Sequence, residues 1–288
     1  MTPYFRHILA CNTWDPGRFV PFLVDDQRIG WIRRDRLPLL SKFTDVFVTG
    51  AKGIHVVDRL SDFESRGAAI EKVGQALLDG GHVPPFRQEL FAAVAAWGQE
   101  PCFELDRGLL PFFGVKGFGV HLNGYFEDAG GLGMWIGHRS ATKKVDPFKL
   151  DNVVAGGIAS GHGVFETLIK EGAEEAAMPA KLLEGAISVG EIRYRLEIPE
   201  GMRDDVLFVY DLEVPDDFSP ENTDGEFDFF ERMSVSRCLE LVAMTDLFKF
   251  NVNLTIIDFA LRHRLIEVDV PEHGFLKGAL RGDLIREP

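Results

Sequence analysis

The second half of the chain alternates apolar and polar residues, which is the pattern of a β-strand with one buried face. Residues 191–198 and 205–214 both show this alternation. Further strands are expected at residues 120–126, 131–139, 150–156 and 227–235. Helices are expected over about 163–177, ended by Pro179, then after residue 235, and finally over 254–266. Strands interspersed with helices predict an α/β (α+β) fold.

The first part of the chain predicts a smaller mixed α/β unit. Two strands joined by a polar turn at residues 25–27 are expected within 19–34. A helix is expected over 61–81, where a Ser61/Glu64 capping box would start it and two glycines would end it. Another helix is expected over 84–98. Neither helix carries an acid–base or nucleophile motif, so we assign this unit no chemistry.

Composition narrows the class of protein. A formal charge of −14 over 288 residues argues against nucleic acid as a partner, because non-specific binding needs a positive surface. No stretch approaches the roughly 18 uncharged apolar residues of a membrane helix. The first residues lack a basic region followed by an apolar one, so a cytoplasmic location is expected. Three distant cysteines, Cys11, Cys102 and Cys238, predict buried thiols and neither a disulfide framework nor a zinc site.

Candidate chemistry is concentrated in residues 156–178, GGIASGHGVFETLIKEGAEEAAM. On the expected helix, Glu171, Glu174 and Glu175 stand at i, i+3 and i+4, so their carboxylates share one face. Like charges crowded in this way are destabilising unless something positive binds them. Carboxylate oxygens are the ligands that Mg²⁺ or Mn²⁺ prefers. The glycines ahead of the helix let backbone groups approach an ion or a phosphate closely.

This stretch resembles the Nudix box, G-x5-E-x7-R-E-U-x-E-E-x-G-U, where U is aliphatic. With the first glycine at Gly156, the three glutamates coincide with the conserved carboxylates of the pattern. Four positions depart from it: His162 for the first glutamate, Lys170 for arginine, Gly172 for an aliphatic residue and Ala177 for glycine. The resemblance implies a Nudix α/β/α sandwich with a mixed sheet. It also implies metal ligation by Glu171, Glu175 and the carbonyl near Ala155 or Gly156, with Glu174 as a further ligand or as the base.

Other segments are similar to the Nudix proteins described as thiamine pyrophosphokinase-related. These segments are FFGVKGFGVHLNGYF (112–126), MWIGHRSATKK (134–144), KLDNVVAGG (149–157) and FKFNVNLTIIDFALRHRLI (248–266). That resemblance implies an accessory N-terminal domain over residues 1–113 and a Nudix domain over 114–288. It also implies hydrolysis of thiamine diphosphate, or of its oxidised, damaged analogues, to the monophosphate.

Cations must lie near an anionic substrate in so acidic a chain. Arg139, Lys143 and Lys144 precede the glycine-rich loop and are candidates to bind phosphate. His162 titrates near neutrality but occupies a bracing position of the pattern, which favours substrate contact or loop packing over proton abstraction. Glu226, in a polar loop before a strand, is a candidate for another metal ligand or the base. Glu166 and Lys170 are expected to form an i, i+4 pair that supports the helix.

Several alternatives remain open at this point. A nucleoside-diphosphate-linked hydrolase, for example one acting on ADP-ribose, would use the same carboxylates. A catalytically weak diphosphate-binding sensor is suggested by the four departures, although the retained glutamates argue against it. Diphosphate isomerisation is disfavoured because no cysteine lies in the catalytic segment. The N-terminal domain could cover the pocket with Trp14, Trp31 or Phe113 stacked on a heterocycle, and a homodimer is compatible with the sequence.

Overall fold

A seven-stranded mixed sheet forms the centre of the computed structural model, which describes residues 2–285. Its main path runs β11-β12-β7-β8-β13, with β10 paired to β7 and β9 paired to β8. Strand β12 runs parallel to β7, and the other pairs in this sheet are antiparallel. The strands are β7 (Lys116–Asp128), β8 (Gly131–Arg139), β9 (Leu150–Asn152), β10 (Val154–Gly157), β11 (Ile187–Ile198), β12 (Gly201–Glu213) and β13 (Phe227–Ser234).

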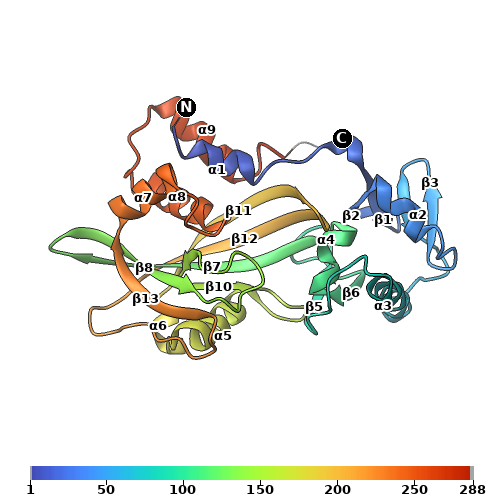
Figure 1. Ribbon diagram of the computed structural model, residues 1–288, viewed down its shortest axis with the longest axis horizontal. Helices are drawn as coiled ribbons and strands as arrows, with labels where there is room; N and C mark the ends of the chain where they lie inside the picture. The colour runs from blue at the N-terminus through green and yellow to red at the C-terminus, as the bar shows by residue number, and fades with distance from the viewer. Residues whose placement is uncertain (1, 286–288) are drawn as a thin grey trace.

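Helices cover both faces of this sheet (Figure 1). On one face lie α5 (Val164–Ala176) and α6 (Ala180–Leu183), and on the other lie α7 (Val235–Met244) and α8 (Val252–Arg262). The two faces are buried in separate hydrophobic clusters because neighbouring strand residues point to opposite sides. On β7, for example, Val120 and Leu122 pack on the α5 side. The α/β/α sandwich with a mixed sheet is therefore confirmed.

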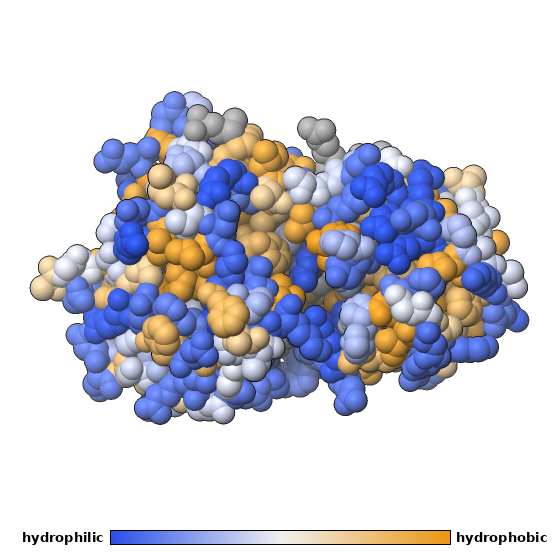
Figure 2. Space-filling view, viewed as in Figure 1, coloured by the Kyte–Doolittle hydropathy of each residue, from blue (hydrophilic) through white to orange (hydrophobic). Residues whose placement is uncertain are grey.

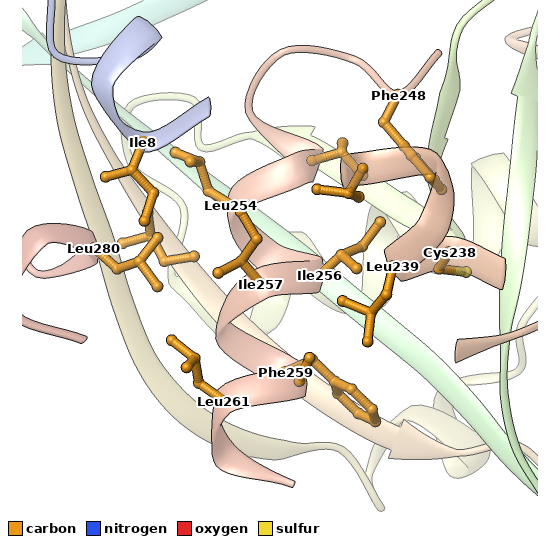
Figure 3. Packing of buried hydrophobic residues seen from close by; sticks show 14 of the residues in the cluster. Ile8, Cys238, Leu239, Phe248, Leu254, Ile256, Ile257, Phe259, Leu261 and Leu280 are labelled. Atoms are coloured by element: carbon orange, nitrogen blue, oxygen red, sulfur yellow. The ribbon is translucent and has the colours of Figure 1, made fainter. Parts of the chain in front are cut away.

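The largest hydrophobic cluster lies under α8, and two distant chain segments complete it. Helices α1 (Phe5–Ala10) and α9 (Val270–Leu280) pack beside α8, so that Ile8 and Leu280 meet Leu254 and Ile257 (Figure 3). The first residues of the chain thus belong to the core of the large sheet. The predicted division between residues 113 and 114 stays a prediction, and α1 lies with the elements beyond it.

A second sheet and a hairpin form the other half of the molecule. The four-stranded sheet has the order β2-β1-β4-β3, with β1 (Phe19–Val24), β2 (Gln27–Arg33), β3 (Phe47–Gly50) and β4 (Gly53–Val56). The hairpin consists of β5 (Leu90–Ala93) and β6 (Phe103–Asp106). Helices α2 (Leu37–Leu40), α3 (Phe63–Asp79) and α4 (Leu110–Phe113) accompany them. Figure 2 shows the surface hollowed where the two halves meet.

Most expected elements are present, but four expectations were wrong. The helix over 84–98 is absent because Phe91 and Ala93 alternate inward and pair with β6, and this pairing overrides the helical propensity. The strand over 150–156 breaks at Val153, where the chain leaves β8 for β7. Helix α8 ends at Arg262 and is followed by α9, so it is not the final helix. In addition, the cap of α3 is Asp62, whose side chain accepts from Ser65 N at 2.8 Å.

Local packing accounts for two departures from the Nudix pattern. Gly172 is buried, and a Cβ at this position would lie 2.7 Å from Leu183 Cδ1, so α6 fills the space that an aliphatic residue would need. Ala177 caps α5 in the left-handed region with φ 51°. The pattern has glycine there because glycine adopts this conformation without steric penalty.

No helix among the described residues has the length and apolar character needed to span a bilayer. The three cysteines are free: Cys11 and Cys238 are buried and Cys102 is partly buried. Burial raises the pKa of Cys11 and of Cys238 to about 12. These pKa values make Cys11 and Cys238 unreactive thiols. The expected burial is confirmed for these two cysteines but not for Cys102.

Replacing Ala177 with glycine should stabilise the protein by about 1 kcal/mol, because it removes the left-handed strain of a residue with a Cβ. The midpoint of thermal unfolding should rise by about 2–4 °C, as measured by calorimetry. The matched control is Ala176→Gly, one residue earlier in the helix and fully buried, which should lower the midpoint. A lower midpoint in Ala177→Gly would contradict the strain argument.

Candidate functional site

Helix α5 presents its three glutamates in three different environments. Glu174 is 52% exposed, the side chain of Glu171 is 18% exposed, and Glu175 is buried. The helix begins at Gly163, whose N–H donates to Glu166 Oε2 at 3.1 Å and whose carbonyl accepts from Thr167. The three carboxylates therefore lie on one side of the helix, as their spacing predicts, but they differ in how far they are exposed to solvent.

Glu175 fixes the helix to the sheet. Its Oε2 accepts from the backbone N–H of Ala155 in β10 at 2.8 Å. Burial raises the pKa of Glu175 to about 8, while this hydrogen bond and the nearby Lys143 act in the opposite direction. Near neutral pH, a carboxyl group with such a pKa is present in both its protonated and its charged form. A cation placed against it favours the charged form.

Gly156 allows the second carboxylate to lie against the strand. A Cβ at Gly156 would lie 2.3 Å from Glu171 Cγ and 2.7 Å from its Oε2. Only glycine therefore permits this approach of α5 to β10. The backbone of Gly156 and the side chains of Glu171 and Glu175 therefore lie close together, and their role as metal ligands stays a prediction.

The loop over residues 221–226 closes the other side of the site. Thr223 Oγ1 donates to the carbonyl of Glu174, and Glu226 forms an ion pair with Lys143. Burial raises the pKa of Asp224, while Lys143 lowers it. Glu226 thus belongs to a loop that contacts α5 through Thr223, and its role as a metal ligand or base stays a prediction. Asp224 is a neighbouring carboxylate that the sequence did not single out.

Lysines neutralise the carboxylates in this structure. Lys170 Nζ lies 3.0 Å from Glu171 Oε1 and 2.7 Å from Glu174 Oε2. Burial opposes its charge, but these hydrogen bonds raise the pKa of Lys170. The expected pair with Glu166 does not form, because Glu166 instead contacts His162 Nδ1 at 3.1 Å. His162 is exposed and braces the start of α5, which agrees with its position in the pattern.

Within residues 2–285, no group of three or more His, Cys, Asp or Glu side chains is already arranged to hold a metal ion. The donor chemistry nevertheless fits a hard divalent cation, because the carboxylates cluster at a site where only lysines now balance their charge. A cation there would take over the role of Lys170 between Glu171 and Glu174. It would also compensate the buried charge of Glu175.

The three cations expected to bind phosphate are placed very differently. Arg139 is buried, and its guanidinium donates to Asp151, to Val145 O and to Asp146 O. This placement contradicts a role in phosphate binding, because contact with substrate would break a buried ion pair. The side chain of Lys143 is mostly buried, forms an ion pair with Glu226 and is close enough to Glu175 to interact with its charge. Burial lowers the pKa of Lys143. Lys144 is exposed on the same loop.

A buried polar network lies behind the site, and the sequence analysis missed most of it. Asn152 Oδ1 binds His121 Nδ1 at 2.9 Å and accepts from Thr255 Oγ1 at 2.8 Å. Asn152 Nδ2 donates to Asn123, which in turn donates to Asp211. Arg262 then joins Asp211 to α8. The K-L-D-N and I-D-F-x-x-R-H runs, which carried the resemblance to the thiamine-related branch, therefore meet in this network.

The aromatic residues considered for stacking on a heterocycle are packed inside the protein. Trp31 and Phe113 are buried, with Trp31 5.4 Å from Trp14 and Phe113 5.4 Å from Phe22 between ring centroids. That expectation was wrong for Trp31 and Phe113, because their rings are buried. Trp14 is partly buried and packs against the cluster of Phe19, Trp31 and Met202. The exposed tryptophan of the N-terminal half is Trp97, at 41% exposure. The same half touches the catalytic loop directly, since Ser160 N donates to Leu90 O at 2.8 Å.

Comparisons with known proteins identify several similar chains. A domain of unknown function (DUF4743) matches residues 3–117. Over 285 residues the chain is 39% identical to Nudix hydrolase 24, chloroplastic, of Arabidopsis thaliana, covering 98% of this chain and 78% of that protein. It is 37% identical to Nudix hydrolase 20, chloroplastic, of the same plant, covering 92% and 74%. The crystal structure of a MutT protein from Methanosarcina mazei Go1 is similar over 52% of this chain and 96% of its own, with 14% identity and a TM-score of 0.41.

The plant relatives match both halves of this chain, including the strand, glycine-rich loop and helix that bring Gly156, Glu171 and Glu175 together. The chain is a hydrolase and belongs to the Nudix family.

Proposed function

We propose that this chain cleaves the diphosphate of thiamine diphosphate, or of its oxidised, damaged analogues, to the monophosphate and phosphate. The observation that carries the diphosphate chemistry is Glu175, a buried carboxylate held on Ala155 N–H beside Glu171 and Gly156. A buried acidic group with so high a pKa is typical of functional sites. The thiamine moiety is supported by the sequence resemblance to the thiamine-related branch.

The metal-binding residues in this proposal are Glu171, Glu174 and Glu175, with the carbonyl of Gly156 and the carboxylate of Glu226 as further oxygen donors. Mg²⁺ or Mn²⁺ bound there would lower the pKa of a water and neutralise charge on the phosphates. Lys170 must leave its contacts with Glu171 and Glu174 for these carboxylates to bind an ion. Because Lys170 is 51% exposed, its side chain can move into solvent.

Glu174 has an alternative role as the base in place of metal ligation. It is the most exposed of the three glutamates, so it can accept a proton from a water that enters from solvent. Lys143 and the exposed Lys144 can meet phosphate oxygens, and Lys143 would exchange its contact with Glu226 for the substrate. His162 can contact the substrate only if it leaves Glu166. Arg139 supports the loop that carries the two lysines.

The expected cytoplasmic location is part of this proposal. The names of both Arabidopsis relatives include the word chloroplastic. Fractionation of cells that express the full-length protein would decide between these compartments.

Glu175→Gln should lower turnover by at least about a hundredfold, because the amide keeps the acceptor for Ala155 N–H but cannot carry the charge that a metal needs. Product release from a diphosphate substrate with Mg²⁺ is the measurement. Glu184→Gln, in an exposed residue just after α6, is the matched control and should keep full activity. Equal activity of Glu175→Gln and the unaltered chain would overturn the proposal.

The substrate is tested with a panel of thiamine diphosphate, oxothiamine diphosphate, ADP-ribose, NADH and coenzyme A. The thiamine compounds should give the highest kcat/KM, and EDTA should abolish all turnover. A preference for ADP-ribose would contradict the thiamine assignment but keep the chemistry. Binding of these compounds without turnover of any of them would favour the sensor.

Glu175→Gln should also change how stability depends on pH in metal-free protein. Burial raises the pKa of Glu175 from its ordinary value of 4.5 to about 8 in the folded state. The contribution of Glu175 to stability is therefore fully present below pH 4.5 and is lost as pH rises to about 8, whereas the variant has no such loss. With EDTA, the unfolding midpoint of the variant should exceed that of the native chain by at least about 2 °C more at pH 9 than at pH 5. The same difference at both pH values would show that Glu175 is not buried in its charged form.

A further inference from the structure

The hairpin β5–β6 of the N-terminal half packs on the catalytic loop, residues 158–163, which joins β10 to α5. Figure 1 shows the hairpin between α3 and the large sheet. The carbonyl of Leu90 in β5 accepts a hydrogen bond from the backbone N–H of Ser160 in the loop, at 2.8 Å. A segment distant in the sequence therefore fixes part of the loop that precedes the catalytic helix.

Gly157, the last residue of β10, lies in close contact with two side chains of the hairpin. A Cβ at this position would lie 2.9 Å from Phe91 Cζ and 3.3 Å from both Cζ and Nη2 of Arg107. Cβ atoms in proteins essentially never approach another atom to less than 3.0 Å, so the ring of Phe91 leaves no room for a side chain here. Glycine at this position allows the hairpin to lie directly against the strand.

The part of the hairpin that contacts Gly157 is held by its own hydrogen bonds. Arg107 Nη1 donates to Glu89 Oε2 at 2.8 Å, and the backbone N–H of Arg107 donates to the carbonyl of Glu89 at the same distance. The guanidinium also lies 5.5 Å from the centre of the Phe91 ring. The preceding residue, Asp106, is buried and accepts from three backbone N–H groups. These contacts give the hairpin a defined surface against which β10 rests.

Apolar packing also connects the hairpin to both ends of the catalytic loop. Val94, which follows β5, belongs to one buried cluster with Ile158, the first residue of the loop. Ala92 of β5 and Val164, the first residue of α5, pack against the same cluster. The start of the catalytic helix is therefore in one apolar cluster with residues of the N-terminal half.

The strand β10 is held from two sides. Successive residues of a strand point to opposite faces, so Gly156 and Gly157 make different contacts. A Cβ at Gly156 would meet Glu171 of α5, whereas one at Gly157 would meet the hairpin. The carbonyl of Gly156 is a proposed metal ligand, and no side-chain rotation can reorient it. Its position therefore depends on the contacts that fix the backbone of β10.

We propose that the hairpin β5–β6 is a positioning element of the metal site. Phe91 and Arg107 act through Gly157 to hold the carbonyl of Gly156 in place for a divalent ion, and the carbonyl of Leu90 holds the loop that follows. The inference rests on the proposed function, because it requires an ion at these residues. It gives the N-terminal half a part in catalysis that needs no contact with the substrate.

Binding of Mn²⁺ to the intact chain in the absence of substrate tests this role, with free Mn²⁺ measured by electron paramagnetic resonance. Gly157→Ala should weaken binding by about tenfold, because the methyl group presses on Phe91 and displaces β10, and lost outer contacts to metal ligands have effects of this size. The matched control is Gly67→Ala in α3, where no heavy atom of the described residues lies within 4 Å of the added methyl. This control should leave the affinity unchanged.

A second substitution should reverse the effect of the first. Phe91→Leu shortens the side chain that Gly157→Ala would meet, so the double variant should recover most of the lost Mn²⁺ affinity. Phe91 is buried, so its truncation lowers the unfolding midpoint measured by calorimetry. The double variant should therefore be less stable than Gly157→Ala and yet bind Mn²⁺ more tightly. General instability predicts the opposite order of affinities.

Arg107→Ala removes a contact without adding bulk, and its side chain is 38% exposed, so the variant should fold. Mn²⁺ binding should weaken by about fivefold, the effect of losing one hydrogen bond of typical strength. At saturating Mg²⁺ the KM for the diphosphate substrate should stay unchanged. A raised KM with unchanged Mn²⁺ affinity would show instead that Arg107 contacts the substrate, and would overturn the positioning role.

The measurements separate failure of this inference from failure of the proposed function. Equal Mn²⁺ affinity in Gly157→Ala, Arg107→Ala and the unaltered chain would refute the positioning role and leave the proposed metal site intact. A double variant that binds Mn²⁺ more weakly than Gly157→Ala would refute it as well. Absence of Mn²⁺ binding to the unaltered chain would refute the proposed metal site, and the inference with it.

Discussion

The hydrogen bond from Ala155 N–H to the carboxylate of Glu175 holds helix α5 against strand β10, and the rest of the site depends on it. A carboxylate in this position is buried, so its charge is disfavoured unless a cation is close. In the proposed function, Glu175 must carry that charge to bind a metal ion. Lys143 supplies part of the compensation in the structure, and a divalent ion would supply more. The proposed ion would therefore offset the cost of burying the charge of Glu175.

Close approach of α5 to the sheet requires small residues at its contacts. Gly156 leaves room for Glu171, and Gly172 leaves room for Leu183. Departures from the Nudix pattern are therefore of two kinds. Gly172 is compensated by a side chain from α6, whereas Ala177 keeps the left-handed conformation of the glycine that it replaces and carries the strain. His162 likewise keeps a bracing function, because it contacts Glu166 at the start of the same helix.

Local sequence patterns predicted the parts of this structure that depend on local interactions. The spacing of Glu171, Glu174 and Glu175 put them on one helix face, and alternation located β11 and β12. Patterns failed where partners distant in sequence decide. Residues 84–98 were predicted to form a helix because the sequence does not reveal the pairing of β5 with β6. Arg139 was predicted to bind phosphate because the sequence does not reveal its buried partner Asp151. Glu175 is buried because it contacts β10, so the spacing along the helix could not predict that Glu175 is buried and Glu174 exposed.

Basic side chains show why the number of charges in a sequence says little about where an anion binds. Arg139 is buried against Asp151 and serves the fold, whereas Lys170 makes its contacts at the surface and can exchange them. Arg193 is half exposed and belongs to the same class as Lys170. What distinguishes the two classes is the free energy of breaking an existing pair, which is high in the interior and low in water. An acidic protein can therefore handle anionic ligands, provided that a few of its cations are held in pairs that solvent can replace.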